Sequence, residues 1–328
     1  MTTPYIGWAS DEDLSDKSNQ KDLIEKFRSG DIRALARMIT LVERRDPSIR
    51  QLEESLRDAH KPARVTGFTG APGTGKSTIV DAVVALLRKQ DTPVAVLATD
   101  PNSPFTGGAI LGDRIRMQRH ALDPKVFIRS MGARGHLGGL SLASREAIRL
   151  LGSFGFAEVI LETVGVGQSE LEVAAVADTT VVVLTPNLGD SVQMIKAGIL
   201  EIASIFVVNK ADIEGHARAV TELRSMLHLA PKGGWKPPIV ATVAVRGEGI
   251  DELWEAVLAH RRHLETTGLA EEQAARRLRN ETAEVAAELA RERTRRALEE
   301  DPGLSERLLR DGTPYRTAEE ILRTRVDN

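Results

Sequence analysis

The fold is decided by one stretch, Gly70-Ala71-Pro72-Gly73-Thr74-Gly75-Lys76-Ser77, which fits the pattern G-x-x-x-x-G-K-[ST]. Ahead of it, Val65–Thr69 is a short run of strand-forming residues, and behind it residues 79–87 have the apolar spacing of an amphipathic helix. A phosphate-binding loop requires a strand and a helix on either side. We therefore predict that the chain binds a nucleoside triphosphate, the alternative being an ordinary glycine-rich turn.

The residue types of this loop suit phosphate chemistry. Its glycines let successive backbone N–H groups turn toward phosphate oxygens, and the start of the following helix adds partial positive charge. Lys76 can reach the β- and γ-phosphate oxygens, where it would also assist catalysis, and Ser77 offers a hydroxyl to Mg²⁺. The residues expected to bind the phosphates are Gly70, Pro72, Gly73, Thr74, Gly75, Lys76, Ser77 and Thr78.

A second motif, Asn209-Lys210-Ala211-Asp212, identifies the base. It follows Ile205–Val208, an apolar run typical of a parallel strand buried on both faces. The carboxylate of Asp212 can accept hydrogen bonds from N1–H and N2–H₂ of guanine, whereas adenine presents a lone pair at N1. Asn209 is placed to tie this loop to the phosphate loop, and the stem of Lys210 can lie along the base. The sequence therefore predicts GTP and GDP as ligands rather than ATP.

Two acids at strand ends are candidates for the Mg²⁺ shell. Glu162 follows the apolar run 159–161, and the glycine-rich residues after it include Gly165, whose N–H can meet the γ-phosphate. Asp100 ends another apolar run. The predicted metal ligands are thus Ser77, Asp100 and Glu162, although Glu162 could also be a simple cap and Asp100 part of an Asp-Pro turn. The glycine-laden segments 106–114 and 135–140 are interpreted as switches.

The composition narrows the class of protein. The chain has 328 residues, 41% of them hydrophobic, and a net charge of −3 from 44 basic and 47 acidic residues. This balance gives no global basic field, so neither nucleic acid nor a membrane is an expected partner. The absence of cysteine excludes disulfides, thiolate catalysis and cysteine-based metal sites. With no long apolar stretch or signal pattern either, we expect a cytoplasmic protein.

Strand-like and helical runs alternate from about residue 64 to 262, which predicts an α/β fold, a P-loop NTPase with a mostly parallel sheet flanked by helices. Ligands of such sheets bind beyond the carboxyl ends of the strands. The predicted parts are a flexible tail (1–20), an N-terminal helical extension (21–62), the GTPase domain (63–264) and a C-terminal helical dimerisation arm (265–328). The predicted strands include residues 65–69, 94–97, 126–128, 158–161, 180–184, 205–208 and 239–240.

Three helical details accompany this division. Asp31 is a candidate N-cap for the apolar stripe of residues 32–42. The helix predicted over 271–300 is interpreted as an arm that packs on another subunit, the alternative being a solvated amphipathic helix. His260 and His263 are three residues apart on a helix and are interpreted as a solvated helix end rather than a metal site.

Several longer strings resemble the methylmalonyl-CoA mutase-associated GTPases of the MeaB/ArgK type. They include Asp100–Pro104, Thr106–Asp113 and Glu162–Glu170. Residues Arg33–Glu43 look like the helical entry of that family, and Thr313–Tyr315 looks like its closing segment. The resemblance runs from about Gly30 to the C-terminus, and these strings are far more specific than the phosphate loop.

The resemblance implies a G-protein chaperone of an adenosylcobalamin-dependent acyl-CoA mutase that gates cofactor loading and protects the mutase. It also implies a homodimer, and a third switch at 187–196 whose Lys196 or Gln193 couples the partner to hydrolysis. It further implies that a loop of Val243, Ala244 and Val245 contacts the base through backbone N–H groups. Two residues depart from the family pattern: Ser191 stands where an acid is expected, and Val243 stands where serine is usual.

Three other functions remain open at this stage. A nickel or cobalt metallochaperone GTPase has the same fold but needs clustered cysteine and histidine ligands, which this chain lacks. A kinase needs a base for the acceptor hydroxyl, and the spacing of the residues places none. An adaptor would bind GTP without hydrolysing it, and a phosphate-release assay separates it from a GTPase.

Overall fold

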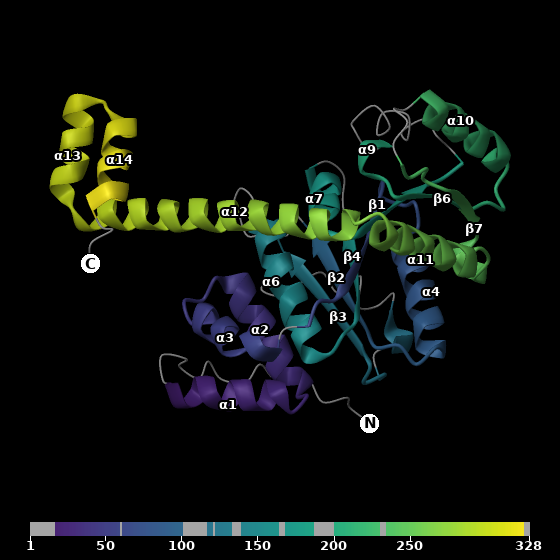
Figure 1. Cartoon of the computed structure of the whole chain (residues 1–328), viewed down its shortest axis with the longest axis horizontal. Helices are drawn as coiled ribbons and strands as arrows, with labels where there is room; N and C mark the ends of the chain where they lie inside the picture. Colours follow the sequence, from purple (N-terminus) through teal and green to yellow (C-terminus); the bar gives the residue numbers. More distant parts are fainter. Residues whose placement is uncertain are drawn as a thin grey trace. The chain divides into compact units, whose positions relative to one another are not determined.

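The computed structural model of the chain describes residues 17–59, 61–100, 117–120, 122–132, 139–163, 168–186, 200–229 and 234–324. It divides into two compact units that span residues 1–270 and 271–328. The first unit contains the sheet and the second contains most of the C-terminal helices (Figure 1). We describe each by itself.

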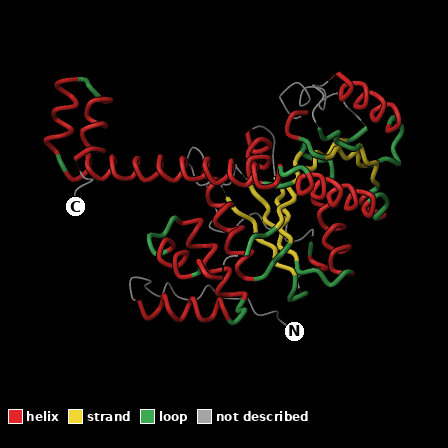
Figure 2. The backbone as a smooth tube through the Cα atoms, viewed as in Figure 1, coloured by secondary structure: helices red, strands yellow, loops and turns green. Residues whose placement is uncertain are grey.

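The first unit is built on a parallel sheet, shown in yellow in Figure 2. Its seven described strands lie in the order β3-β2-β4-β1-β5-β6-β7, and every pair of neighbours is parallel. This confirms the predicted α/β class and all of the predicted strands. Their bounds are β1 Arg64–Thr69, β2 Val94–Asp100, β3 Val126–Gly132, β4 Glu158–Thr163, β5 Thr179–Leu184, β6 Ile205–Asn209 and β7 Ile239–Thr242.

The central strands have apolar side chains on both faces because helices cover both. All six residues of β5 and all five of β6 are buried. In β2 the side chains of Ala95 and Leu97 join one core, whereas Val94 and Val96 join the other. This alternation is the two-residue period of a strand, so the two cores lie on opposite faces of the sheet.

The helices of this unit form the two outer layers. Helices α6 and α7 pack on one face with α2 (Ile32–Arg44), and α4 and α11 pack on the other. The bounds are α4 Lys76–Lys89, α6 Gly139–Phe154, α7 Gln168–Val176, α9 Leu200–Ile202, α10 His216–Leu229 and α11 Ile250–Thr266. Short 3₁₀ turns are η1 Arg57–Ala59, η2 Gln118–His120 and η4 Ala244–Arg246. Because all of the described strands are parallel, their carboxyl ends lie at the same edge of the sheet.

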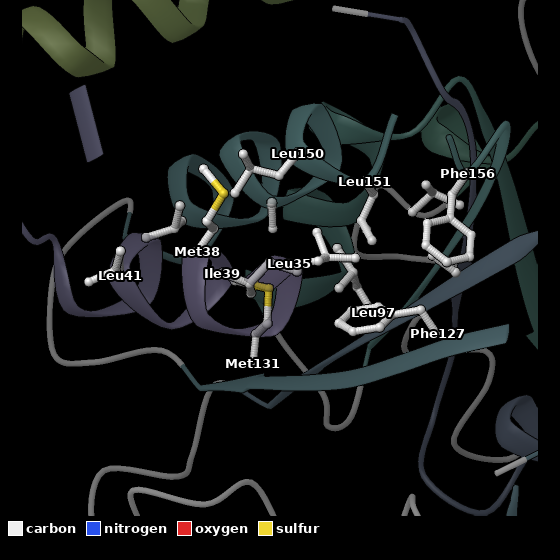
Figure 3. Close-up of a cluster of buried hydrophobic side chains, with 14 of the residues drawn as sticks. Leu35, Met38, Ile39, Leu41, Leu97, Phe127, Met131, Leu150, Leu151 and Phe156 are labelled. Atoms are coloured by element: carbon white, nitrogen blue, oxygen red, sulfur yellow. The ribbon is translucent and has the colours of Figure 1, made fainter. Parts of the chain in front are cut away.

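The N-terminal helices extend one of these cores. Figure 3 shows side chains of α2 meeting those of α6 and of the β2–β3 edge. The three helices are α1 Lys17–Arg28, α2 Ile32–Arg44 and α3 Ile49–Ser55. Asp31 caps α2 as predicted, its carboxylate accepting from the Arg33 N–H at 2.8 Å. Helix α1 begins at Lys17, inside the segment predicted as tail, and residues 1–16 lie outside the described residues.

The second unit is helical. Helix α12 (Leu269–Glu300) corresponds to the long helix predicted over 271–300, and it is followed by α13 (Pro302–Asp311) and α14 (Pro314–Thr324). Ala297, Leu304 and Ile321 form its small core. Leu309 and Tyr315 are each 89% exposed. None of the described helices of the chain combines the length and the apolar composition needed to span a bilayer.

Candidate nucleotide site

The phosphate loop lies between the end of β1 and the start of α4, at the carboxyl edge of the sheet. Two of its glycines are required by close contacts. Gly70 has φ of +139°, and a Cβ there would lie 2.2 Å from the Val183 carbonyl oxygen. Gly75, the N-cap of α4, has φ of +93°, and a Cβ there would lie 2.3 Å from Nδ2 of Asn209. Any side chain at either position would therefore distort the loop.

Lys76 is held by hydrogen bonds to the backbone of this loop. Its Nζ donates to the carbonyl oxygens of Gly70 at 2.7 Å and Ala71 at 3.1 Å. The residue is buried, and these two hydrogen bonds hold the ammonium group against the backbone of the loop. This position is compatible with the predicted contact between Lys76 and phosphate oxygens, which stays a prediction.

The side chains of Ser77 and Glu162 are in contact next to the phosphate loop. Oγ of Ser77, in the first turn of α4, donates to Oε1 of Glu162 at the end of β4 over 2.6 Å. Both side chains are buried, Glu162 to 1% exposure. Hydroxyl and carboxylate oxygens are hard ligands that suit Mg²⁺, and the ion is ordinarily held by few protein ligands together with substrate phosphates. The residues present therefore fit the predicted Mg²⁺ position.

Asn209 links three segments of the site. Its Nδ2 donates to the Thr74 carbonyl at 2.8 Å, which is the predicted tie between the base loop and the phosphate loop. Its Oδ1 accepts from Oγ1 of Thr242 at 3.0 Å and from the N–H of Ala244 at 3.2 Å. The side chain is 3% exposed. Because three of its hydrogen bonds are made to other segments, Asn209 fixes the distance between the phosphate and base ends of the site.

Lys210 and Asp212 follow in the exposed part of the loop. Lys210 has a left-handed backbone, with φ of +59°, and its Nζ donates to the Gly73 carbonyl at 2.8 Å. Its stem therefore crosses from the base loop to the phosphate loop. Asp212 has a side chain 38% exposed, with Oδ2 lying 3.6 Å from Nη1 of Arg246. A hydrogen bond to Glu248 raises the pKa of Arg246, with smaller contributions from the charges of Glu248 and Asp212.

The loop expected to contact the base is a 3₁₀ turn at the end of β7. The N–H of Val243 donates to the Glu248 carbonyl at 3.0 Å, and the N–H of Ala244 donates to Asn209. These two N–H groups are thus engaged within the protein. Val245 is 81% exposed beside them. Of the three predicted residues, Val245 therefore offers the most open surface to a base.

The remaining predicted residues are not all described. Asp100 closes β2, and because Thr99 pairs with Thr163 the backbone brings Asp100 to the same edge as Glu162. The side chain of Asp100 lies outside the described residues, as do Gly165, Ser191, Gln193 and Lys196 with their switches. Segments 106–114 and 135–138 also lie outside, and Gly139 begins α6.

Two residues of the site were missed from the sequence. Thr242 supplies a hydroxyl to Asn209, and its place at the end of a predicted strand was a signal that could have found it. Arg246 contacts Asp212 from a separate loop. No sequence pattern distinguishes such an arginine from an ordinary surface residue.

The interpretation of His260 as part of a solvated helix end was wrong. His260 is 5% exposed, and its Nδ1 lies 2.9 Å from Oγ1 of Thr179 at the start of β5. The Trp235 ring packs against both imidazoles, at 5.0 and 5.1 Å between ring centroids. Burial, together with the charges of His263 and Arg261, lowers the pKa of His260 to about 4. His260 is therefore a buried residue near the start of β5, at the opposite edge of the sheet from the phosphate loop.

Comparison with known proteins identifies relatives of this chain. A family model described as methylmalonyl Co-A mutase-associated GTPase MeaB matches residues 35–299. A putative GTPase of Pyrococcus horikoshii is 45% identical over 306 residues, covering 92% of this chain and 96% of its own length. The GTPase ArgK of Escherichia coli is 39% identical over 274 residues, covering 80% and 83%.

Two further relatives extend the comparison. The mitochondrial methylmalonic aciduria type A homolog of Mus musculus is 36% identical over 269 residues, covering 75% of this chain and 64% of its own length. A solved structure titled LAO/AO transport system kinase aligns with a TM-score of 0.67 at 29% identity, covering 94% of this chain and 97% of that one. The chain therefore belongs to the MeaB family of GTPases, as the resemblance of its motifs predicted.

Proposed function

We propose that this chain is a Mg²⁺-dependent GTPase that acts as a chaperone of an adenosylcobalamin-dependent acyl-CoA mutase. The observation that supports it best is the convergence of four segments at one edge of the sheet. The phosphate loop, Glu162, Asn209 with Asp212, and the turn after β7 all meet there. Triphosphate, metal and guanine each have a group of suitable chemistry in that cluster.

Base selection rests on the exposed carboxylate of Asp212. Guanine offers two donors on the edge that would face it, and adenine offers an acceptor there that the carboxylate would repel. Lys210 is tethered to the phosphate loop at Gly73, so its stem forms one wall of the base position. We therefore infer that GTP and GDP are bound in preference to ATP and ADP.

The proposed hydrolysis depends on positive charge at the phosphate loop. Lys76 and the N-terminal N–H groups of α4 would stabilise the negative charge that develops on the transferred phosphoryl group. Ser77 and Glu162 would hold Mg²⁺, which supplies charge neutralisation at the phosphates when bound. Gly165 is the proposed N–H donor to the γ-phosphate. Among the described residues, the basic groups bonded to the phosphate loop are Lys76 and Lys210, and neither is an arginine, so the basal rate should be slow.

The mutase partner is proposed from the family. The matching family model is described as mutase-associated, and the mouse relative is named for methylmalonic aciduria. By this likeness the third switch at 187–196 would respond to the mutase, with Lys196 or Gln193 moving toward the triphosphate. Gating of cofactor loading and protection of the mutase are the functions that such a coupling would serve.

A homodimer held through the C-terminal helices is proposed with it. In the second unit α13 and α14 leave Leu309 and Tyr315 exposed, and Leu278 on α12 is 61% exposed. Large apolar side chains on a unit with a small core favour a partner surface, here a second copy of the chain.

The alternatives predict different results in one assay. Phosphate release should be measured with GTP and with ATP, each with and without the cobalamin-dependent mutase of the same cell. The proposal expects slow release from GTP, acceleration by the mutase, and little release from ATP. An adaptor would release none. Phosphate release from ATP equal to that from GTP, or transfer of phosphate to an added protein or small molecule, would favour the kinase hypothesis.

A further inference from the structure

The turn between β7 and α11 has a fixed backbone. Val243 and Glu248 form an isolated antiparallel bridge, and Gly247 between them has φ of +73°. Gly249 then passes so close to the end of β7 that a Cβ on it would lie 2.2 Å from the Ala241 carbonyl oxygen. Ala244 belongs to the same turn, and its N–H donates to Oδ1 of Asn209 at the end of β6. Side chains that leave this turn therefore start from a defined position.

Arg246 leaves the turn and lies between two carboxylates. Its Nε donates to Oε1 of Glu248 at 2.7 Å and its Nη2 to Oε2 of Glu248 at 3.4 Å. This bidentate contact uses one edge of the guanidinium, and Nη1 on the other edge lies 3.6 Å from Oδ2 of Asp212. The planar fork of arginine makes such a bridge possible, whereas a lysine ammonium could not hold the same geometry.

Asp212 needs such a neighbour. To accept from N1–H and N2–H₂ of guanine at once, both of its oxygens must face the base, yet its side chain is 38% exposed. Val243, at the start of the same turn, has no polar atom in its side chain to orient the carboxylate. Among the described residues, Arg246 is the basic group in contact with it.

We propose that Arg246 is a positioning residue for guanine, holding the Asp212 carboxylate in the orientation that accepts both donors of the base. The inference rests on the proposed function, because it takes Asp212 as the group that reads guanine. At 3.6 Å the guanidinium attracts Oδ2 without occupying it at hydrogen-bond distance, so that oxygen keeps lone pairs for the base. Glu248 holds the guanidinium at this separation.

The test compares nucleotides that differ in one donor. GDP offers N1–H and N2–H₂, inosine diphosphate keeps N1–H alone, and ADP offers neither in that place. Affinities for the three should be measured by calorimetry with Mg²⁺ on the full-length chain and on Arg246→Ala. Arg218→Ala is the matched control, because Arg218 is exposed on α10 and donates its Nε to Glu222 at the same 2.7 Å distance.

Arg246→Ala should weaken GDP binding by about 5- to 20-fold, the effect of losing the alignment of one or two charge-assisted hydrogen bonds. Inosine diphosphate should lose less, so the preference for GDP over it should fall, and ADP should be unaffected. Arg218→Ala should leave all three affinities unchanged. In an Asp212→Ala background, Arg246→Ala should cause less than about a twofold further change, since it would act through Asp212.

Other results would overturn the assignment. An unchanged ratio of GDP to inosine diphosphate affinity in Arg246→Ala would show that Arg246 does not position the carboxylate. Tighter GDP binding would show that the guanidinium competes with the base instead. Equal binding of GDP and ADP by the wild-type chain would refute the proposed base recognition itself, which is a separate failure seen before any variant is made.

Discussion

Ser77 and Glu162 are joined by a hydrogen bond of 2.6 Å between Oγ and Oε1, although one lies in α4 and the other ends β4. The parallel register that pairs Phe68 with Glu162 brings the end of β4 beside the end of β1, from which the phosphate loop starts. The sheet therefore holds the two proposed metal ligands side by side, and preorganised ligands cost little reorganisation on binding.

The first prediction concerns this pair. Ser77→Ala should weaken GDP binding in the presence of Mg²⁺ by about tenfold or more, because a hydroxyl ligand is lost, and should have little effect in EDTA. Calorimetry with and without Mg²⁺ measures the difference. Ser77→Thr is the control, since threonine keeps the hydroxyl and should retain the Mg²⁺ dependence. If Ser77→Ala binds GDP as tightly as wild type in Mg²⁺, the hydroxyl is not a metal ligand.

The second prediction is that Asp212→Asn changes which nucleotide base the chain prefers. Asp212→Asn replaces a carboxylate oxygen with an amide donor, which suits the C2 carbonyl of xanthine and opposes the amino group of guanine. Affinity for xanthosine diphosphate should rise and that for GDP should fall, as measured by competition against a fluorescent nucleotide. A variant that keeps its preference for GDP would show that another group reads the base.

Stability should depend on pH through His260. Its folded-state pKa of about 4 lies below the ordinary value of 6.5, so the unfolded chain takes up the proton first as pH falls. The contribution of neutral His260 is complete above about pH 6.5 and is lost between there and about pH 4, amounting to at most about 3 kcal/mol. Urea unfolding across this range measures it.

The matched variant for that experiment is His260→Gln, which cannot take up the proton. It should be less stable than wild type at pH 7, because it disturbs the contacts with Thr179 and Trp235. The difference between the two proteins should shrink as pH falls toward 4. A constant difference would mean that His260 does not titrate in this range.

The sequence predicted this fold well because its signals are local. The strands β5 and β6 are buried on both faces and so appear as unbroken apolar runs, and the phosphate loop carries its own glycines. His260 was misread because histidine is polar. Its spacing from Leu253 and Val257 nevertheless continues the buried face of α11, and that periodicity was a usable signal.

Arg246 could not be found in the same way. Its contact with Asp212 depends on how two loops meet at the edge of β6 and β7, which is a property of the sheet register rather than of either loop. Asn209 was predictable because its motif has a fixed place at a strand end, whereas the partner it finds in Ala244 again required the register.

The C-terminal helices should be removable. A chain that ends at Gly268 keeps all of α11, its C-cap at Thr267 and the ion pair of Arg64 with Glu265. It should bind GDP as the full chain does and should be a monomer, because the exposed apolar residues of α13 and α14 are gone. Light scattering on both forms decides this, and a full-length chain that is monomeric at micromolar concentration would contradict the proposed dimer.

The last prediction tests the coupling to the mutase. Lys196 belongs to the segment after β5, and β5 ends at the edge where the phosphate loop lies beside it. A partner that ordered this segment could bring Lys196 toward the triphosphate and stabilise the charge of the transition state by a few kcal/mol, about 10²-fold or more in rate.

Lys196→Ala should then leave the basal hydrolysis of GTP nearly unchanged and remove most of the acceleration by the mutase. Phosphate release with and without the mutase measures both rates. Gln193→Ala, measured alongside, shows whether the coupling belongs to Lys196 or to its neighbour, and equal acceleration of Lys196→Ala and wild type would refute the role of the lysine.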